Sequence, residues 1–89
     1  MNSIPITVGM IVISRMGRDQ GRRFLVMQEI DADFVYVADG GLRTVDRLKK
    51  KRRKHLIPTR DCVEGLRDRL RSGAAIENHE IRSWLKEEK

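Results

Sequence analysis

The chain has 89 residues, a formal net charge of +6 at pH 7 and a single cysteine, Cys62. This length allows one small domain with a modest core, which excludes a large enclosed active site. One cysteine excludes an intrachain disulfide, and its neighbours predict a buried, inert thiol on a helix. No run approaches the roughly 20 apolar residues that span a bilayer, and the first residues lack the basic region of a signal peptide. We therefore expect a cytoplasmic protein with no membrane partner.

Three short strands are predicted in the first part of the chain, because apolar side chains alternate over residues 10–14, 22–30 and 34–38. The side chains that gather on single faces are Ile11 with Ile13, Phe24 with Val26 and Ile30, and Val35 with Val37. Short strands separated by frequent turns predict a small barrel, whose closure removes exposed edges.

Turn signals separate these strands, and two further strands are expected after them. Asp31-Ala32-Asp33 predicts a tight turn, because Asp bonds its own backbone. Asp39-Gly40-Gly41 predicts a hairpin, because Gly supplies the positive φ that such turns require. A weaker fourth strand is expected at residues 42–48, and a fifth at residues 54–59, ended by Pro58.

The last 30 residues change to helical periodicity. A first helix is predicted over residues 61–72, with Asp61 and Glu64 at capping-box spacing and Gly73 as its stop. A second helix is predicted after Asn78 as N-cap. Its apolar stripe consists of Ile81, Trp84 and Leu85. Packing of this stripe on the barrel or on the first helix is favoured, and docking onto another protein is the alternative.

The positive charge is concentrated in residues 43–60, which hold nine Lys or Arg against one acid, Asp46. A cluster of this kind favours a polyanionic partner, of which nucleic acid is the commonest inside cells. An anionic membrane surface is less favoured, because no amphipathic helix or lipidation signal accompanies the run.

The segment from residue 8 to residue 41 has the layout of a KOW motif: strand, G-x-x-x-G loop, strand, turn, strand. Within this class the chain resembles the fourteenth-e type of large-subunit ribosomal protein from archaea and eukaryotes, and small bacterial proteins that share its domain. The matching positions are Val8-Gly9, Gly17 to Gly21, Ile30-Asp31, Phe34 to Val37, His55-Leu56 and Pro58-Thr59.

This resemblance implies a mainly β fold and binding of structured RNA, usually ribosomal RNA. The expected organisation is a small SH3-like (KOW) barrel at residues 1–59 with a basic loop at 43–54, followed by a C-terminal extension of one or two short helices at 60–89. The run from Lys49 to Lys54 lacks apolar anchors, so two readings stay open. It is either a barrel strand or a solvated arm that orders only on RNA.

The candidate RNA-binding residues are the basic side chains around the first loop and within the basic run, with the adjoining histidine. They are Arg15, Arg18, Arg22, Arg23, Arg43, Arg47, Lys49, Lys50, Lys51, Arg52, Arg53, Lys54 and His55. Gly17 and Gly21 either only permit the loop to turn or also let its backbone approach RNA. Tyr36 has a choice between stacking on a base and packing on the sheet, and packing is favoured. Recognition through phosphates of folded RNA is therefore expected.

The sequence indicates no enzyme. His and Cys lack metal-ligand spacing, and no nucleophilic triad, Walker loop or dinucleotide fingerprint is present, so no cofactor, metal or small-molecule substrate is expected. We expect an RNA-binding protein that is ribosomal or ribosome-associated. The alternative is a protein-interaction module of the transcription or translation machinery, which would contact ribosomal or RNA polymerase proteins through the barrel face and the Trp84 helix.

Overall fold

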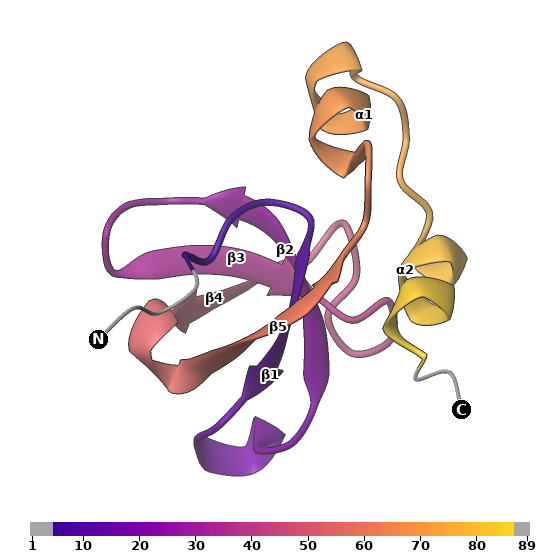
Figure 1. Ribbon diagram of the computed structural model, residues 1–89. Helices are drawn as coiled ribbons and strands as arrows, with labels where there is room; N and C mark the ends of the chain where they lie inside the picture. Colours follow the sequence, from indigo (N-terminus) through magenta and orange to yellow (C-terminus); the bar gives the residue numbers. More distant parts are fainter. Residues whose placement is uncertain (1–4, 87–89) are drawn as a thin grey trace.

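The computed structural model describes residues 5–86 and contains one antiparallel sheet followed by two helices (Figure 1). The elements in chain order are β1 (Met10–Ser14), the 3-10 turn η1 (Gly17–Asp19), β2 (Arg23–Glu29), β3 (Phe34–Ala38), β4 (Lys49–Arg52), the 3-10 turn η2 (Arg53–His55), β5 (Leu56–Cys62), α1 (Leu66–Ser72) and α2 (Asn78–Leu85). The expected fold class, a small mainly β protein with C-terminal helices, is confirmed.

The sheet has the strand order β4-β3-β2-β1-β5, and every neighbouring pair is antiparallel. Its two outermost strands, β4 and β5, are joined by only the three residues of η2. Because this connection is short, it brings the ends of the two outermost strands close together. The sheet therefore curls (Figure 1). The fold is therefore barrel-like.

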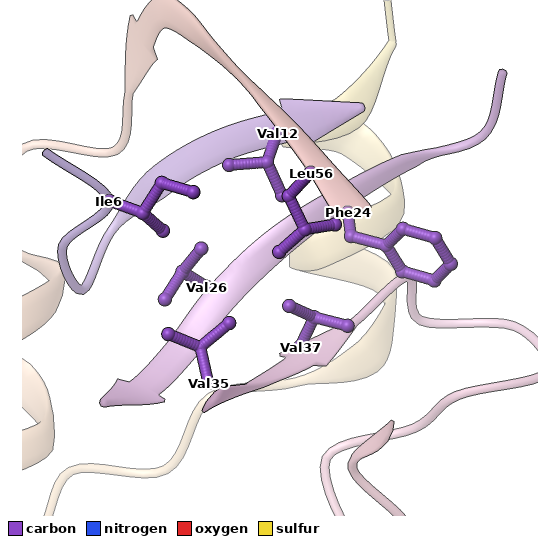
Figure 2. Packing of buried hydrophobic residues seen from close by; sticks show 7 residues of the cluster. All are labelled: Ile6, Val12, Phe24, Val26, Val35, Val37 and Leu56. Carbon is purple, nitrogen blue, oxygen red and sulfur yellow. The ribbon is translucent and has the colours of Figure 1, made fainter. Parts of the chain in front are cut away.

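Apolar side chains from β1, β2, β3 and β5, together with Ile6, fill the inside of the curled sheet. Figure 2 shows this cluster, which consists of Ile6, Val12, Phe24, Val26, Val35, Val37 and Leu56. The predicted pairing of Phe24 with Val26, and of Val35 with Val37, is confirmed. Full burial of an aliphatic or aromatic side chain stabilises a fold by about 1.5–3 kcal/mol, so this cluster is a main source of stability.

A second cluster covers the opposite side of β1, β2 and the end of β3, where the helices pack. Sheet residues Ile11, Leu25, Met27 and Ala38 meet Leu66, Ile76 and Ile81 from the helical part. Trp84 and Leu85 are partly buried against this cluster. The predicted apolar stripe of the last helix therefore packs against the sheet, as favoured, and α2 covers part of the barrel's outer surface.

The predicted fourth strand at residues 42–48 is wrong, because this segment belongs to the loop between β3 and β4. Asp39 turns the chain there, with its Oδ1 accepting the Gly41 N–H at 2.9 Å. Gly40 has φ of +78° and lies against α2, where an added Cβ would stand 2.5 Å from the Asn78 carbonyl oxygen. The Val45 N–H donates to Asn78 Oδ1 at 2.9 Å. Contact with α2 therefore shapes the loop in place of strand pairing.

The basic run is a strand and not an arm. Lys49–Arg52 forms β4 and pairs with β3 in the register Val37↔Lys49 to Phe34↔Arg52. The expected basic loop at 43–54 is therefore wrong at residues 49–52, whereas residues 53–54 lie in the turn η2.

The fifth strand does not end at Pro58 as predicted, but continues to Cys62 and crosses the expected domain boundary. Among residues 5–86, β5 is an outermost strand that pairs with β1, and outermost strands are where Pro is tolerated within a sheet. Cys62 is exposed at the end of this strand, so the predicted buried helical thiol is also wrong.

The first helix begins later than predicted, at Leu66, and Asp61 does not cap it. The reason is that the sheet continues: the Val63 N–H donates to the Gly9 carbonyl oxygen at 2.7 Å. Gly65 precedes the helix in the left-handed region, and Gly73 ends it there, as predicted for Gly73.

The second helix has Glu77 as its N-cap, one residue before the predicted Asn78. Glu77 and Glu80 form a capping box, in which each side chain accepts a backbone N–H of the other residue. The end of the expected helical segment, at residues 87–89, lies outside the described residues. No helix within residues 5–86 has the length and apolar character to cross a bilayer.

Candidate nucleic-acid interface

The loop between β1 and β2 has the tight geometry that its glycines predict. Gly17 and Gly21 have φ of +72° and +87°, and no heavy atom would lie within 4 Å of a Cβ at either position. The glycines are therefore required for backbone conformation and not for close packing within the fold. Arg18, between them in η1, is exposed.

Lys51 binds this loop to β4. Its Nζ lies 3.1 Å from Asp19 Oδ2 and donates to Ser14 Oγ at 3.3 Å. The hydrogen bond from Lys51 is the main cause that lowers the pKa of the Asp19 carboxyl, with the charges of Lys49 and Arg22 adding to it. Because the Lys51 side chain is only 11% exposed, this predicted RNA-binding residue is engaged within the fold.

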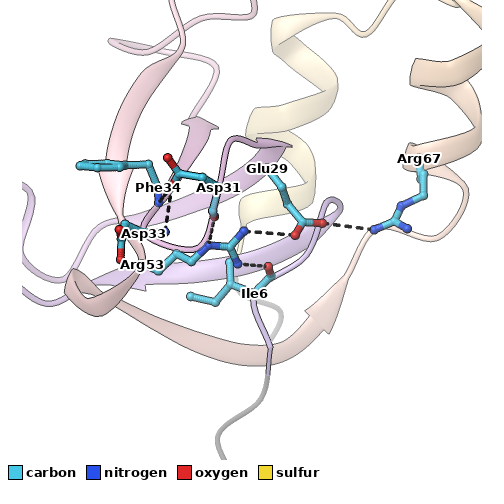
Figure 3. A network of polar contacts seen from close by, with 7 residues as sticks. All are labelled: Ile6, Glu29, Asp31, Asp33, Phe34, Arg53 and Arg67. Carbon is cyan, nitrogen blue, oxygen red and sulfur yellow. Dashed lines mark hydrogen bonds and ion pairs between the residues drawn. The ribbon is translucent and has the colours of Figure 1, made fainter.

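Arg53 is also engaged, at the turn between β2 and β3 (Figure 3). Its guanidinium donates to the carbonyl oxygens of Asp31 at 2.9 Å and Ile6 at 2.7 Å, and to Glu29 Oε1 at 3.1 Å. Glu29 also faces Arg67 of α1 at 3.5 Å. These contacts engage all three guanidinium nitrogens, so Arg53 holds the end of β4 against the rest of the barrel.

Arg23 has a third internal role. Its Nε donates to the Leu85 carbonyl oxygen at 2.9 Å, and its Nη2 lies 3.7 Å from Asp61 Oδ2. A cation at the C-terminal end of α2 satisfies a carbonyl group that the helix leaves unpaired. Arg23 therefore fastens α2 to the sheet.

The other predicted cations are available at the surface to different degrees. Arg15, Arg18, Arg22, Arg47, Lys50, Arg52 and Lys54 are exposed, whereas Arg43, Lys49 and His55 are half-buried. Arg22 also lies 3.7 Å from Asp19, at the outer limit of an ion pair.

Two contacts place the first loop, which carries Arg15 and Arg18, next to the basic run. The Arg15 N–H donates to the His55 carbonyl oxygen at 2.9 Å, which places the first loop beside η2. The ion pair of Lys51 with Asp19 places the same loop beside β4. Arg43 and Arg47 lie apart, in the loop that packs on α2.

Along the basic run the cations alternate between internal and external positions. Lys50, Arg52 and Lys54 are exposed, while Lys51 and Arg53 are the residues held by the fold. None of the three exposed cations forms an ion pair within residues 5–86.

A scan of the chain against protein-family models finds no match. A search of curated proteins finds no match either. Among the described residues, no group of three His, Cys, Asp or Glu side chains is arranged to hold a metal ion.

The sequence offered Tyr36 as a residue that could stack on a base, but it did not show that Phe34 and Tyr36 lie beside the basic run. Phe34 and Tyr36 lie on the same side of the sheet as Lys50 and Arg52, because Phe34 opposes Arg52 and Tyr36 opposes Lys50. We call these four residues the β3–β4 face. In residues 34–37 the two aromatic residues alternate with the two buried valines, and this strand pairs with the basic run. That alternation and that pairing together are the signal that could have found the face.

Proposed function

We propose that the protein binds RNA without catalysing a reaction, and that structured ribosomal RNA is its target. The observation that carries the proposal is the row of exposed cations Lys50, Arg52 and Lys54, which have no carboxylate partner within residues 5–86. Like charges held this close together repel one another, so the arrangement gains stability when a polyanion supplies the counter-charge.

The neighbouring cations extend this row into a surface. Arg15 and Arg18 come from the first loop, which Lys51 fastens beside β4. Each phosphate neutralised releases condensed counterions, and this release drives binding. If about six phosphates are neutralised, the slope of log affinity against log salt is about −4 for single-stranded sites and about −5 for duplex-like ones. A slope near zero would refute the electrostatic basis.

The resemblance to KOW domains supports ribosomal RNA as the target class. The alternative, a protein-interaction module that uses the Trp84 helix, is less favoured by the packing. Trp84 is partly buried against the second core cluster, and the Arg69 guanidinium carbon lies 5.9 Å from its ring centroid. Its indole therefore has contacts within the fold.

The test compares two triple variants that remove the same net charge from different places. Both are titrated with ribosomal RNA over a range of salt concentrations. The first carries glutamine at Lys50, Arg52 and Lys54, and the control carries glutamine at the exposed residues Arg60, Arg71 and Lys86. The first is expected to lower the magnitude of the salt slope by about 2–3 and the control to change it little. Equal losses in both would mean that only net charge matters.

The ribosomal assignment has a separate test. We expect the tagged protein to sediment with the large ribosomal subunit in a sucrose gradient at low salt, and the first triple variant to remain at the top. Survival of the wild-type association at high salt would indicate an integral ribosomal component. Wild-type protein at the top of the gradient at low salt would contradict the assignment.

A further inference from the structure

The outer side of the sheet is covered unevenly. Over β1 and β2 it is buried beneath the helical part, with Leu25 and Ile81 fully buried in the same cluster. Over β3 and β4 it carries the half-buried rings of Phe34 and Tyr36 and the exposed side chain of Arg52. The β3–β4 face is therefore the part of the sheet where aromatic rings remain accessible.

The Phe34 ring organises the cations of this face. The Lys50 Nζ lies 4.5 Å and the Arg52 Cζ 5.0 Å from its centroid. Cations are attracted to the ring because its quadrupole is negative above the plane. One ring thus holds two cations at the surface of the sheet, and neither forms an ion pair within residues 5–86.

Tyr36 stands two residues further along β3, opposite Lys50. Alternate residues of a strand lie roughly 7 Å apart, so Tyr36 and Phe34 form separate platforms. A planar guanidinium such as that of Arg52 is itself a surface on which a base can stack. The face therefore combines π surfaces with unpaired positive charge.

We propose that the β3–β4 face binds unpaired nucleotides of the RNA, with bases stacked on Tyr36 and on the Arg52 guanidinium and an adjoining phosphate on Lys50. This inference rests on the proposed function and adds to it, because phosphate binding alone needs no rings. Paired RNA keeps its bases stacked on one another, whereas bases in loops and bulges are free to stack on side chains. The ligand is thus a single-stranded or looped segment within a folded RNA.

The test uses two RNAs of equal length and charge: a hairpin with 2-aminopurine in its loop, and a fully paired duplex. Tyr36→Leu removes the ring and Tyr36→Phe keeps it. Arg52→Lys keeps the charge and removes the plane. Stacking is worth about 1–3 kcal/mol per base, or about 5- to 150-fold in affinity. Tyr36→Leu is expected to weaken hairpin binding within that range and duplex binding less than twofold, and Tyr36→Phe to leave both unchanged.

Arg52→Lys keeps the test decisive if Tyr36→Leu does not fold, because Arg52 is exposed. It is expected to weaken hairpin binding several-fold more than duplex binding, and to reduce the quenching of 2-aminopurine. Equal effects on the two RNAs would overturn the inference while leaving the proposed function intact. Equal competition by poly-glutamate for the hairpin site of wild type and of Tyr36→Leu would show that the ring gives RNA no advantage over a simple polyanion, and would also overturn it. Failure of the wild type to bind either RNA would refute the proposed function itself.

Discussion

The same substitution at two neighbouring lysines of β4 should affect different properties of the protein: stability at Lys51 and RNA affinity at Lys50. Lys51→Met removes the contact of Nζ with Asp19 at 3.1 Å and the hydrogen bond to Ser14 at 3.3 Å, together with the position of Nζ 5.5 Å from the Phe24 ring centroid, while it keeps an apolar stem. Hydrogen bonds to charged groups contribute about 1.5–3 kcal/mol. We therefore expect the free energy of unfolding to fall by about 2 kcal/mol, since the Asp19 carboxylate loses its main partner.

Lys50→Met is the matched control. This side chain is exposed, and its Nζ lies 4.5 Å from the centroid of the Phe34 ring in a cation–π interaction. Such interactions contribute about 0.5–1 kcal/mol at exposed sites, so stability should fall by less than about 1 kcal/mol. RNA affinity should show the reverse order: Lys50→Met should weaken binding, and Lys51→Met should leave it close to wild type where the protein is folded.

Thermal and urea unfolding, followed by circular dichroism, measure both effects. A change of 1 kcal/mol shifts the Tm of a domain of this size by about 4–8 °C, so Lys51→Met should lower the Tm by about 8–16 °C. The pH gives a second check. The pKa of Asp19 is lowered below 3.8, so the stability that Lys51 adds is present above that pH and is lost as the pH falls through the folded-state pKa. Equal loss of stability in the two variants would refute the distinction.

Three further predictions concern the contacts that fix the fold. Gly40→Ala should lower the free energy of unfolding in urea by about 2–4 kcal/mol, because the strain of positive φ and the overlap with α2 add together. Gly17→Ala has positive φ but open space around it, so it should lower this free energy by only about 1–2 kcal/mol. Equal losses would contradict the role of the contact with α2. The Arg69 hydrogen bond lowers the pKa of Glu80 to about 2 from 4.5, so its stabilisation is complete above pH 4.5 and lost as the pH falls toward 2. Glu80→Gln should flatten the dependence of Tm on pH over this range, and an unchanged profile would contradict that account. Arg53→Lys should lower the Tm, because one ammonium cannot replace three separately directed donors; a Tm equal to wild type would show that these contacts add no stability.

The strands β1, β2 and β3 could be predicted because their inward side chains are apolar at every second position. Val35 and Val37 are fully buried, as the alternation requires. β4 could not be predicted in this way, since Lys49–Arg52 contains no apolar residue. It forms through the backbone ladder with β3 and through the ion pair of Lys51 with Asp19, a residue 32 positions earlier.

In the loop before β4, a strand is predicted from the sequence where the structure has none. The prediction covers residues 42–48, yet Val45 and Leu48 in this segment pack against the cluster beneath the helices. Local β propensity there gave way to burial against α2, which no pattern within the loop reveals. Only part of the candidate site could likewise be predicted from the sequence. Composition located the basic run, but burial separates the structural cations such as Arg53 from the exposed ones such as Arg52.

The position of β4 at the end of the sheet has a consequence for the protein's solubility. Within the described chain this strand pairs on one side only, so its other side presents backbone groups on which a further strand could add. Every residue of β4 is Lys or Arg, and two such edges repel each other. A polyanion that neutralises the strand also removes this repulsion. The protein should therefore self-associate most readily where RNA just balances its charge, and should disperse again when either component is in excess.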